Sequence, residues 1–221
     1  LLARGEYICG LGITEPDRGS NVTYLNTRAF RDGGYYVING NKSYITNGCI
    51  ADFIIVLCQT DPNVNPPHRG QSFFIVEKGT EGFEALEMKN KMGFRMSSTA
   101  ELFFQDVRVP KENLVGELNA GFSYLLKFLN LSRIGISSSM LGIARGAFSR
   151  ALSYARQREQ SGRKIGEFQA IQHKLAEMAT KIEMAHLLVY KAAWSYDHGK
   201  IKPEISSMAK WYSARMAVEV C

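Results

Sequence analysis

The chain has 221 residues, of which 45% are hydrophobic, and a formal net charge of +6. This length and composition allow a buried core in one or two domains. The 27 basic residues are interleaved with 21 acidic residues without a run of five like charges, which argues against nucleic-acid binding. No window approaches the ~20 apolar residues that a transmembrane helix requires, so we expect no membrane span.

The four cysteines form no C-x-x-C pair, and no histidine lies at metal-ligand spacing from them. The four histidines give no Ser-His-Asp pattern either. The first residues lack the charged and apolar regions of a signal peptide. We therefore predict a soluble protein with reduced cysteines and no bound metal, located in the cytoplasm or the mitochondrial matrix.

Residues 23–109 alternate with a period of two, which is typical of β-strands. Asp52–Thr60 and Ser72–Val76 are more continuously apolar and should form the core pair of strands. Asp32-Gly33-Gly34 and Asn39-Gly40 favour tight hairpin turns, because these residues tolerate positive φ, and so predict an antiparallel meander. The other expected strands are Thr27–Phe30, Tyr35–Ile38, Lys42–Thr46, Gly82–Met88 and Thr99–Val109. Together they predict a barrel-like or sandwich β domain.

The hydrophobic period changes near Ala120 to that of amphipathic helices. Apolar residues recur at helical spacing in three runs, which start near Phe122, Ile171 and Ile205. Breaks are expected at Ser161-Gly162 and between His198 and Pro203. Helices of this kind pack as antiparallel bundles, and three of them leave a fourth position unfilled. We therefore predict an α+β, multidomain chain, with a β domain at residues 1–118 and an incomplete antiparallel four-helix bundle at residues 119–221.

Two segments carry the strongest functional signal. Ile13–Asn21 reads ITEPDRGSN, and Lys42–Gly48 reads KSYITNG. In this order and at this spacing they resemble the flavin-contacting segments of the acyl-CoA dehydrogenase family. Three further segments are similar to the same family: Lys91–Pro110, Asn113–Phe122 and Arg156–Gln172. Compared with the family pattern, an N-terminal helical domain and the last helices are missing, so we expect this chain to be part of a longer polypeptide.

The resemblance implies that the first segment contacts FAD. Thr14 and the backbone of Ile13 would bond the pyrimidine edge of the flavin. Ser20 would lie near the FAD pyrophosphate and the pantetheine arm of the substrate, where Gly19 allows the backbone to come close. The same residues also suit a plain surface turn, since proline, aspartate and glycine favour turns in many proteins.

For the second segment, the resemblance implies that Tyr44, Ile45 and Thr46 contact the flavin ring. Tyr44 would lie against the isoalloxazine face, where many relatives have tryptophan. Thr46 would lie near N5 and O4, where a donor stabilises the charge of reduced flavin. A tyrosine in this context also suits a cross-strand aromatic pair in a hairpin.

On the first expected helix, Leu129–Arg133 resembles the substrate-facing turn of the family. Asn130 matches a position that often holds an aspartate bonded to the CoA portion, and Arg133 matches the arginine that follows. A lone helical arginine is usually solvated or ion-paired, but the apolar neighbours Leu129 and Ile134 favour partial burial here.

The loop after the first helix resembles the segment that crosses the dimer interface toward the FAD of the neighbouring subunit. Its implied cofactor contacts are Arg158, Gln160, Phe168 and Gln169. Arginine suits this role because it can bind phosphate with two parallel donors. The family often has phenylalanine at the position of Ser161, so one packing contact is missing. A basic loop between helices is the alternative interpretation.

The implied function is that of an FAD-dependent acyl-CoA dehydrogenase, which removes an α-proton and a β-hydride from an acyl-CoA thioester to give a 2-enoyl-CoA. The partners implied are an electron-transfer flavoprotein and further copies of the chain, in a homodimer or homotetramer. The competing functions are those of an acyl-CoA oxidase, a nitroalkane oxidase or an enoyl-CoA reductase of the same superfamily, or of a non-catalytic assembly module with this fold.

The resemblance places no catalytic base within these residues. Most of the family has its catalytic glutamate near the C-terminus, beyond the position of Cys221. A minority has it on the first long helix, at the position of Ser132, whose hydroxyl is too weak a base to take an α-proton. We therefore expect the base to lie outside this sequence.

Overall fold

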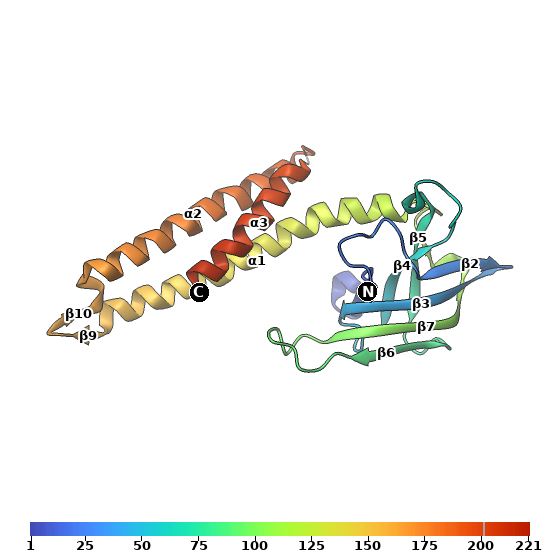
Figure 1. Ribbon diagram of the computed structural model, residues 1–221, viewed down its shortest axis with the longest axis horizontal. Coiled ribbons are helices and arrows are strands. Elements are labelled where there is room, and N and C mark those ends of the chain that lie inside the picture. Colours follow the sequence, from blue (N-terminus) through green and yellow to red (C-terminus); the bar gives the residue numbers. More distant parts are fainter. Residues whose placement is uncertain (201) are drawn as a thin grey trace. The chain divides into compact units, whose positions relative to one another are not determined.

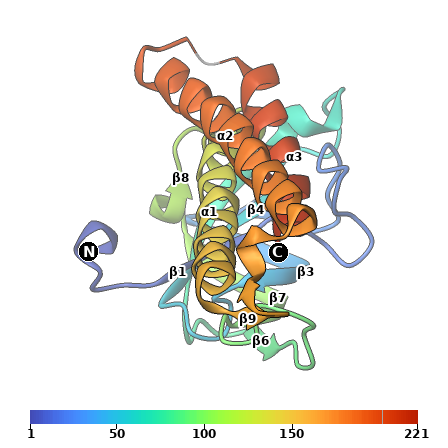
Figure 2. The same cartoon turned by 90° about the vertical axis from the view of Figure 1, so that its left-hand side faces the viewer.

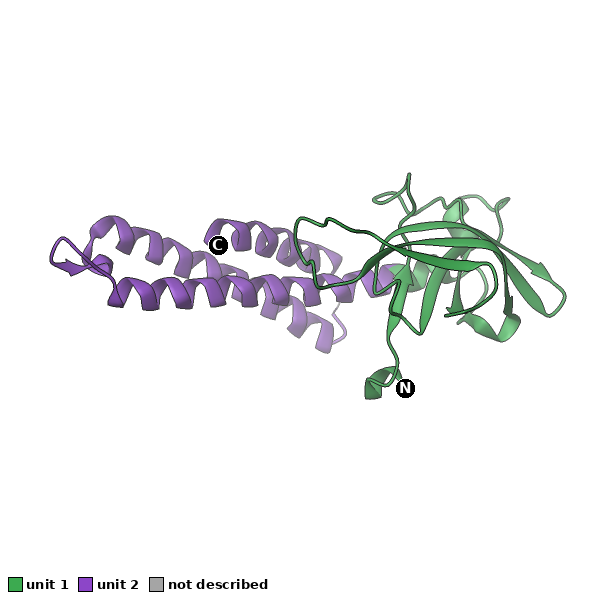
Figure 3. Cartoon of the chain, turned by 90° about the horizontal axis from the view of Figure 1, so that it is seen from below, with its two compact units in different colours: residues 1–125 green, residues 126–221 purple. Residues whose placement is uncertain are grey.

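A computed structural model of the chain describes residues 1–200 and 202–221. They form two compact units, Leu1–Leu125 and Leu126–Cys221, which are coloured separately in Figure 3. Strands build the first unit and helices build the second, so the α+β prediction is confirmed. The expected domain boundary between residues 118 and 119 stays a prediction.

Eight strands of the β unit form one sheet in the order β6-β7-β3-β2-β4-β5-β8, with β1 paired to β4 (Figure 1). The strands are β1 (Cys9–Gly12), β2 (Arg28–Asp32), β3 (Tyr35–Thr46), β4 (Phe53–Gln59), β5 (Gln71–Glu77), β6 (Phe83–Glu87), β7 (Thr99–Pro110) and β8 (Leu114–Val115). Both β1 and β2 pair with β4 in parallel, so the sheet is mixed rather than the simple meander that we expected. Among the described residues no pairing of β6 with β8 closes it into a barrel.

The predicted hairpin turn at Asn39-Gly40 is wrong, because β3 runs straight through both residues. The register between β3 and β7 shifts between Ile38 and Gly40, which marks a β-bulge. Gly40 has a φ of 141°, and an added Cβ would lie 2.5 Å from the Cα of Thr27, so only glycine fits there. The Asn39 side chain exchanges two hydrogen bonds of 2.9 Å with Asp106 of β7, which ties the bulge to its partner strand.

The core of the β unit centres on β4 and β5, as the continuous apolar runs predicted. Ile54 pairs with Val76, and Val56 pairs with Phe74, in antiparallel register. All four side chains are no more than 1% exposed. Burial of a side chain of this size contributes roughly 1.5–3 kcal/mol. This core supports β3, because Ile38 and Ile45 of that strand belong to the same buried cluster.

Three long helices, α1 (Gly121–Gln157), α2 (Gln169–Asp197) and α3 (Pro203–Val220), confirm the helical prediction. In the helical unit they share one core, to which α1 contributes Leu141 and Ala144. Figures 1 and 2 show α2 and α3 beside α1 in both views. In the part of the chain that the structure describes, no helix has the length and apolar character needed to cross a membrane.

The breaks between helices fall where glycine and proline predicted them. At Ser161-Gly162 both residues have positive φ, and they close a small hairpin of β9 (Glu159–Gln160) and β10 (Arg163–Lys164), which the sequence pattern did not predict. At the second break Gly199 has a φ of 65° and Pro203 starts α3, while Ile201 lies outside the described residues. Short 3-10 helices occur at Leu2–Arg4, Pro67–Gly70, Lys111–Asn113 and Ile165–Glu167.

Candidate functional site

The two segments that carry the family resemblance lie side by side in the β unit. The Ser43 N–H donates to the Thr14 carbonyl at 2.8 Å. The Lys42 Nζ donates to the Ile13 carbonyl at 3.0 Å. Both carbonyls of residues 13 and 14 are therefore bonded to the start of the second segment. No described residue accepts a hydrogen bond from the Thr14 N–H, so the segment keeps a donor on its remaining side.

A buried ion pair joins the two segments. The Lys42 Nζ lies 3.0 Å from Glu15 Oε1, and the two side chains are 0% and 1% exposed. The Glu15 carboxylate also accepts hydrogen bonds from the backbone N–H of Asn26 at 2.7 Å and of Thr27 at 2.9 Å. Every charged atom of the pair thus has partners, which a buried pair requires to be tolerated. Sequence reasoning missed this pair and left residues 15–19 open as a plain surface turn.

Burial and the opposite charge of the partner shift the pKa values of both groups in the pair. Burial by itself raises the pKa of the Glu15 carboxyl, but the Lys42 charge and the two backbone N–H groups outweigh burial and hold that pKa below its ordinary value. Burial lowers the pKa of the Lys42 ammonium, and the Glu15 charge opposes that shift. The nearby thiol of Cys58 is fully buried, which raises its pKa to about 12 and leaves it neutral.

Tyr44 presents its ring to solvent on a strained backbone. Lys42 and Ser43 are consecutive strand residues, yet both are buried, and the register with β7 shifts between Lys42 and Ile45. The normal alternation is therefore broken by a bulge, and Tyr44 beyond it is 65% exposed with a φ of 61°. A bulky residue rarely adopts positive φ, and such strain is found preferentially at functional sites.

The other residues predicted to contact the flavin differ in how much of each is exposed to a ligand. Thr46 is exposed, whereas the Ile45 side chain is 3% exposed and packs in the core, so only the Ile45 backbone remains for a ligand. Ser20 and Gly19 are exposed as well. An added Cβ at Gly19 would meet only Thr14 Cγ2, at 3.9 Å, so nothing within the described chain requires glycine there.

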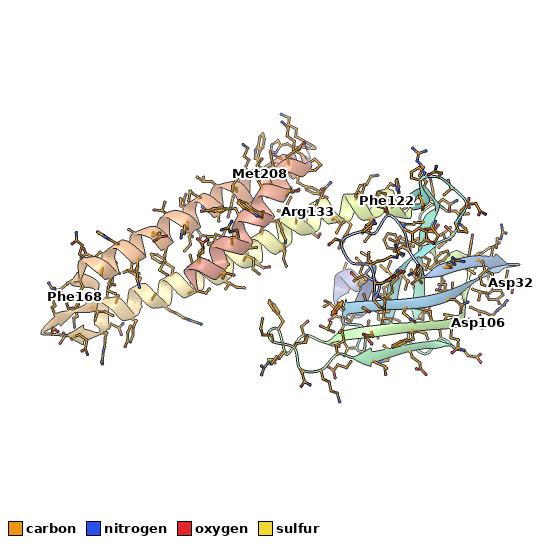
Figure 4. All side chains as sticks on the ribbon, in the orientation of Figure 1. Asp32, Asp106, Phe122, Arg133, Phe168 and Met208 are labelled. Carbon is orange, nitrogen blue, oxygen red and sulfur yellow. The ribbon has the colours of Figure 1, made fainter. Side chains whose placement is uncertain are left out.

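The candidate substrate residues lie on α1. The Arg133 Nη1 donates to the Asn130 Oδ1 at 2.8 Å, and both residues are half-buried, which confirms the partial burial expected for Arg133. The Ser132 hydroxyl donates to the Leu129 carbonyl at 3.1 Å, so it is a helical hydroxyl bonded to its own backbone. In Figure 4, Arg133 is labelled on α1, nearer to the N-terminal end of the helix than to its C-terminal end.

The residues predicted to cross a subunit interface gather around the β9–β10 hairpin. Arg158, Gln160 and Gln169 are exposed. Phe168, labelled at the start of α2 in Figure 4, is half-buried, and the Arg163 guanidinium lies 4.1 Å from the centre of its ring. A surface ion pair between Lys164 and Glu159 links the two strands of the hairpin. Among the described residues, no cluster of three histidine, cysteine or acidic side chains could hold a metal ion.

Comparison with known proteins assigns both halves of the chain. The acyl-CoA dehydrogenase middle domain matches residues 10–107, and the acyl-CoA dehydrogenase C-terminal domain matches residues 119–221.

Individual relatives and a solved structure support the same family assignment. The short-chain specific acyl-CoA dehydrogenase of Clostridium acetobutylicum is 42% identical over 99% of this chain, and the caffeyl-CoA reductase-Etf complex subunit CarC of Acetobacterium woodii is 40% identical over 98% of it. The structure of butyryl-CoA dehydrogenase from Megasphaera elsdenii matches 99% of the chain at 40% identity, with a TM-score of 0.94. The chain spans 57% of the length of each of these three proteins. It belongs to the acyl-CoA dehydrogenase family, whose members are FAD-dependent oxidoreductases that act on CH–CH bonds.

Proposed function

We propose that the complete protein is an acyl-CoA dehydrogenase that converts an acyl-CoA thioester into a 2-enoyl-CoA. The observation that supports this most directly is the pairing of residues 13–15 with Lys42 and Ser43, directly before Tyr44, which is exposed on a strained bulge. A surface turn and a hairpin tyrosine without function would need neither a buried ion pair nor a positive φ at an aromatic residue.

The groups that these two segments leave available for a ligand fit the flavin of FAD. They are the Tyr44 ring, the Thr14 N–H, and the hydroxyls of Thr14, Ser20 and Thr46, so they combine one aromatic face with hydrogen-bond donors. A flavin ring carries carbonyl oxygens and ring nitrogens at its edge, which require donors. The carboxylate of Glu15, which would repel such a ring, is buried and faces Lys42.

FAD, when bound, supplies the acceptor for the β-hydride. In our proposal Thr14 and the Ile13–Thr14 backbone hold the pyrimidine edge of the ring. Tyr44 and the Ile45 backbone lie against the ring, and the Thr46 hydroxyl donates near N5 and O4. Ser20 lies beside the pyrophosphate and the pantetheine arm, where the absence of a side chain at Gly19 leaves open space.

We further propose that the neighbouring copy of the chain completes each FAD site with Arg158, Gln160, Phe168 and Gln169. Exposed apolar side chains on α2 support assembly, since Met184, Leu187, Tyr190 and Trp194 recur at helical spacing on one face. A homodimer or homotetramer would cover such a face. The mass of the complete protein in solution, measured by light scattering, tests this proposal.

For the substrate, we propose that Asn130 and Arg133 contact the CoA portion of the thioester. Their mutual hydrogen bond fixes both side chains on one turn of α1. The base that takes the α-proton is proposed to lie outside these 221 residues, because the Ser132 hydroxyl at the second known base position is too weak a base.

The proposed electron acceptor is an electron-transfer flavoprotein, an assignment supported by the name of the related Acetobacterium woodii subunit, which belongs to a reductase-Etf complex. The same name makes an enoyl-CoA reductase the second candidate. An acyl-CoA oxidase and a non-catalytic module are the third and fourth candidates. The cytoplasm or the mitochondrial matrix stays the predicted compartment.

The deciding experiment uses the complete protein encoded by the gene. We expect the purified protein to show a flavin spectrum that bleaches anaerobically on addition of short-chain, medium-chain or branched acyl-CoA, with recovery on addition of an oxidised electron-transfer flavoprotein. Rapid oxygen consumption would assign an oxidase instead. Oxidation of reduced flavin by an enoyl-CoA without any bleaching by an acyl-CoA would assign a reductase. A colourless protein that does not take up FAD would contradict the proposal and support a non-catalytic module.

A further inference from the structure

The buried ion pair between Glu15 and Lys42 occurs where the two segments that we assign to the flavin meet. Its atoms are sequestered from water, with the Lys42 Nζ 3.0 Å from Glu15 Oε1 and 3.0 Å from the Ile13 carbonyl. A buried pair of charges is weak evidence for stability, because desolvation offsets much of the attraction. Its position therefore calls for an explanation other than stability.

Lys42 bonds directly to the peptide group that we assign to the flavin edge. Its ammonium donates to the Ile13 carbonyl, and the N–H of the same peptide group belongs to Thr14. A cation on the carbonyl side of a peptide polarises the group and makes its N–H a stronger donor, and the effect is larger where water is excluded. The Thr14 N–H has no acceptor among the described residues, so it is left for a ligand.

Glu15 fixes the Lys42 ammonium in this place. Its carboxylate is held by Lys42 on one side and by the Asn26 and Thr27 N–H groups on the other. Lys42 and Ser43 both turn inward, the first to this carboxylate and the second, through its N–H, to the Thr14 carbonyl. Both inward residues lie at the register shift with β7, directly before the outward Tyr44. The ion pair therefore adjoins both the Thr14 donor and the bulge that carries the Tyr44 ring.

We infer that Glu15 and Lys42 are positioning residues for the cofactor: Lys42 orients and polarises the Ile13–Thr14 peptide group toward the flavin, and Glu15 holds Lys42 there. This inference rests on the proposed function. Neither side chain touches the ligand. Both act through Thr14 and Tyr44, so their removal changes the affinity and the reduction potential of FAD rather than the identity of the reaction.

The test compares Lys42→Met, Glu15→Gln and the double variant in the complete protein. Each single variant leaves a buried polar group without its partner and is expected to unfold more easily. The double variant removes both charges while keeping side chains of similar volume, so it leaves no buried charge without its counter-ion. It is therefore the decisive variant. Val76→Ala is the matched control, since it creates a cavity in the core of the same unit and Val76 belongs to neither segment.

We expect the double variant to melt close to the wild-type apoprotein yet to bind FAD about tenfold to a hundredfold more weakly, the range of one lost charged hydrogen bond. The flavin that it does bind should have a more negative reduction potential, because a weaker Thr14 donor stabilises the reduced ring less. Val76→Ala should melt at a lower temperature with unchanged FAD affinity and potential. A double variant with wild-type affinity and potential would show that the pair is only structural. Failure of the wild-type protein itself to bind FAD would instead overturn the proposed function.

Discussion

In the β unit, residues 13–15 are joined to Lys42 and Ser43 through a buried ion pair, whereas in the helical unit the hairpin at residues 159–164 carries its ion pair on the surface. The Lys42–Glu15 side chains are 0% and 1% exposed, but those of Lys164 and Glu159 are 42% and 62% exposed. Water and ions screen the second pair and reach the first only if the sheet opens. In our proposal the β unit is therefore the preformed half of the cofactor site. The hairpin of the helical unit presents exposed side chains that need another surface to bind.

The largest effect is expected from breaking the buried pair on one side. Glu15→Ala leaves the Lys42 ammonium buried without its counter-ion, which should lower the free energy of unfolding of the β unit by about 3–5 kcal/mol. Urea unfolding followed by a β-sheet signal measures this change. Glu159→Ala is the matched surface control and should unfold at the wild-type urea concentration. Equal midpoints for the two variants would contradict the contrast between the two regions.

Arg158→Ala tests the exposed half-site and should act on the cofactor alone. Because Arg158 is exposed, its loss should leave the unfolding transition of the complete protein unchanged. The retention of FAD should fall by about tenfold or more, the size of a lost charged hydrogen bond. Flavin occupancy after gel filtration measures this effect, with Arg150→Ala on α1 as a control. Unchanged occupancy would remove Arg158 from the site.

Acid pH should lower the stability of the β unit through the buried pair, because folding lowers the pKa of the Glu15 carboxyl below its ordinary value of 4.5. The resulting stabilisation is complete above the pKa of the unfolded chain and is lost as the pH falls through the lower, folded-state pKa. The Cys58 thiol stays neutral throughout this acid range, because burial raises its pKa to about 12. The β unit should therefore lose stability below the ordinary carboxyl pKa.

Urea midpoints measured at a series of acid pH values test this prediction. In the Glu15→Gln, Lys42→Met double variant this component of the pH dependence should be absent. A double variant with the wild-type slope would show that other carboxylates cause the acid sensitivity.

The smallest effect is expected at Thr46, where the fold should not change at all. Thr46 is exposed on β3, and valine suits a strand, so Thr46→Val should unfold like the wild type. Loss of the hydroxyl should slow the reduction of the flavin by substrate or shift the flavin potential. Stopped-flow absorbance and potentiometry measure these quantities, with the exposed Thr180→Val on α2 as the control. If both quantities matched the wild type, Thr46 would not lie near N5.

Much of the fold followed from local sequence patterns. The apolar runs of β4 and β5 are continuous because both faces are buried at Leu57–Gln59 and Gln71–Phe74 and partly buried at Ile55 and Ile75, and a run of this kind is visible in the sequence itself. The helical stripes and the glycine and proline breaks likewise depend on residues close together in the chain. The candidate cofactor segments were found because two short motifs, in their order and spacing, resemble those of the acyl-CoA dehydrogenase family.

The features that only the tertiary structure decided depend on residues far apart in the chain. Glu15 and Lys42 are 27 residues apart, and nothing local distinguishes a buried carboxylate in a Pro-Asp-Gly context from an exposed one. The Asn39-Gly40 pair has the chemistry of a hairpin turn, but the pairing of β3 with β7 converts it into a bulge. The positive φ of Tyr44 occurs at the register shift with β7, directly after Lys42 and Ser43, which bond to residues 13–15 far away in the chain.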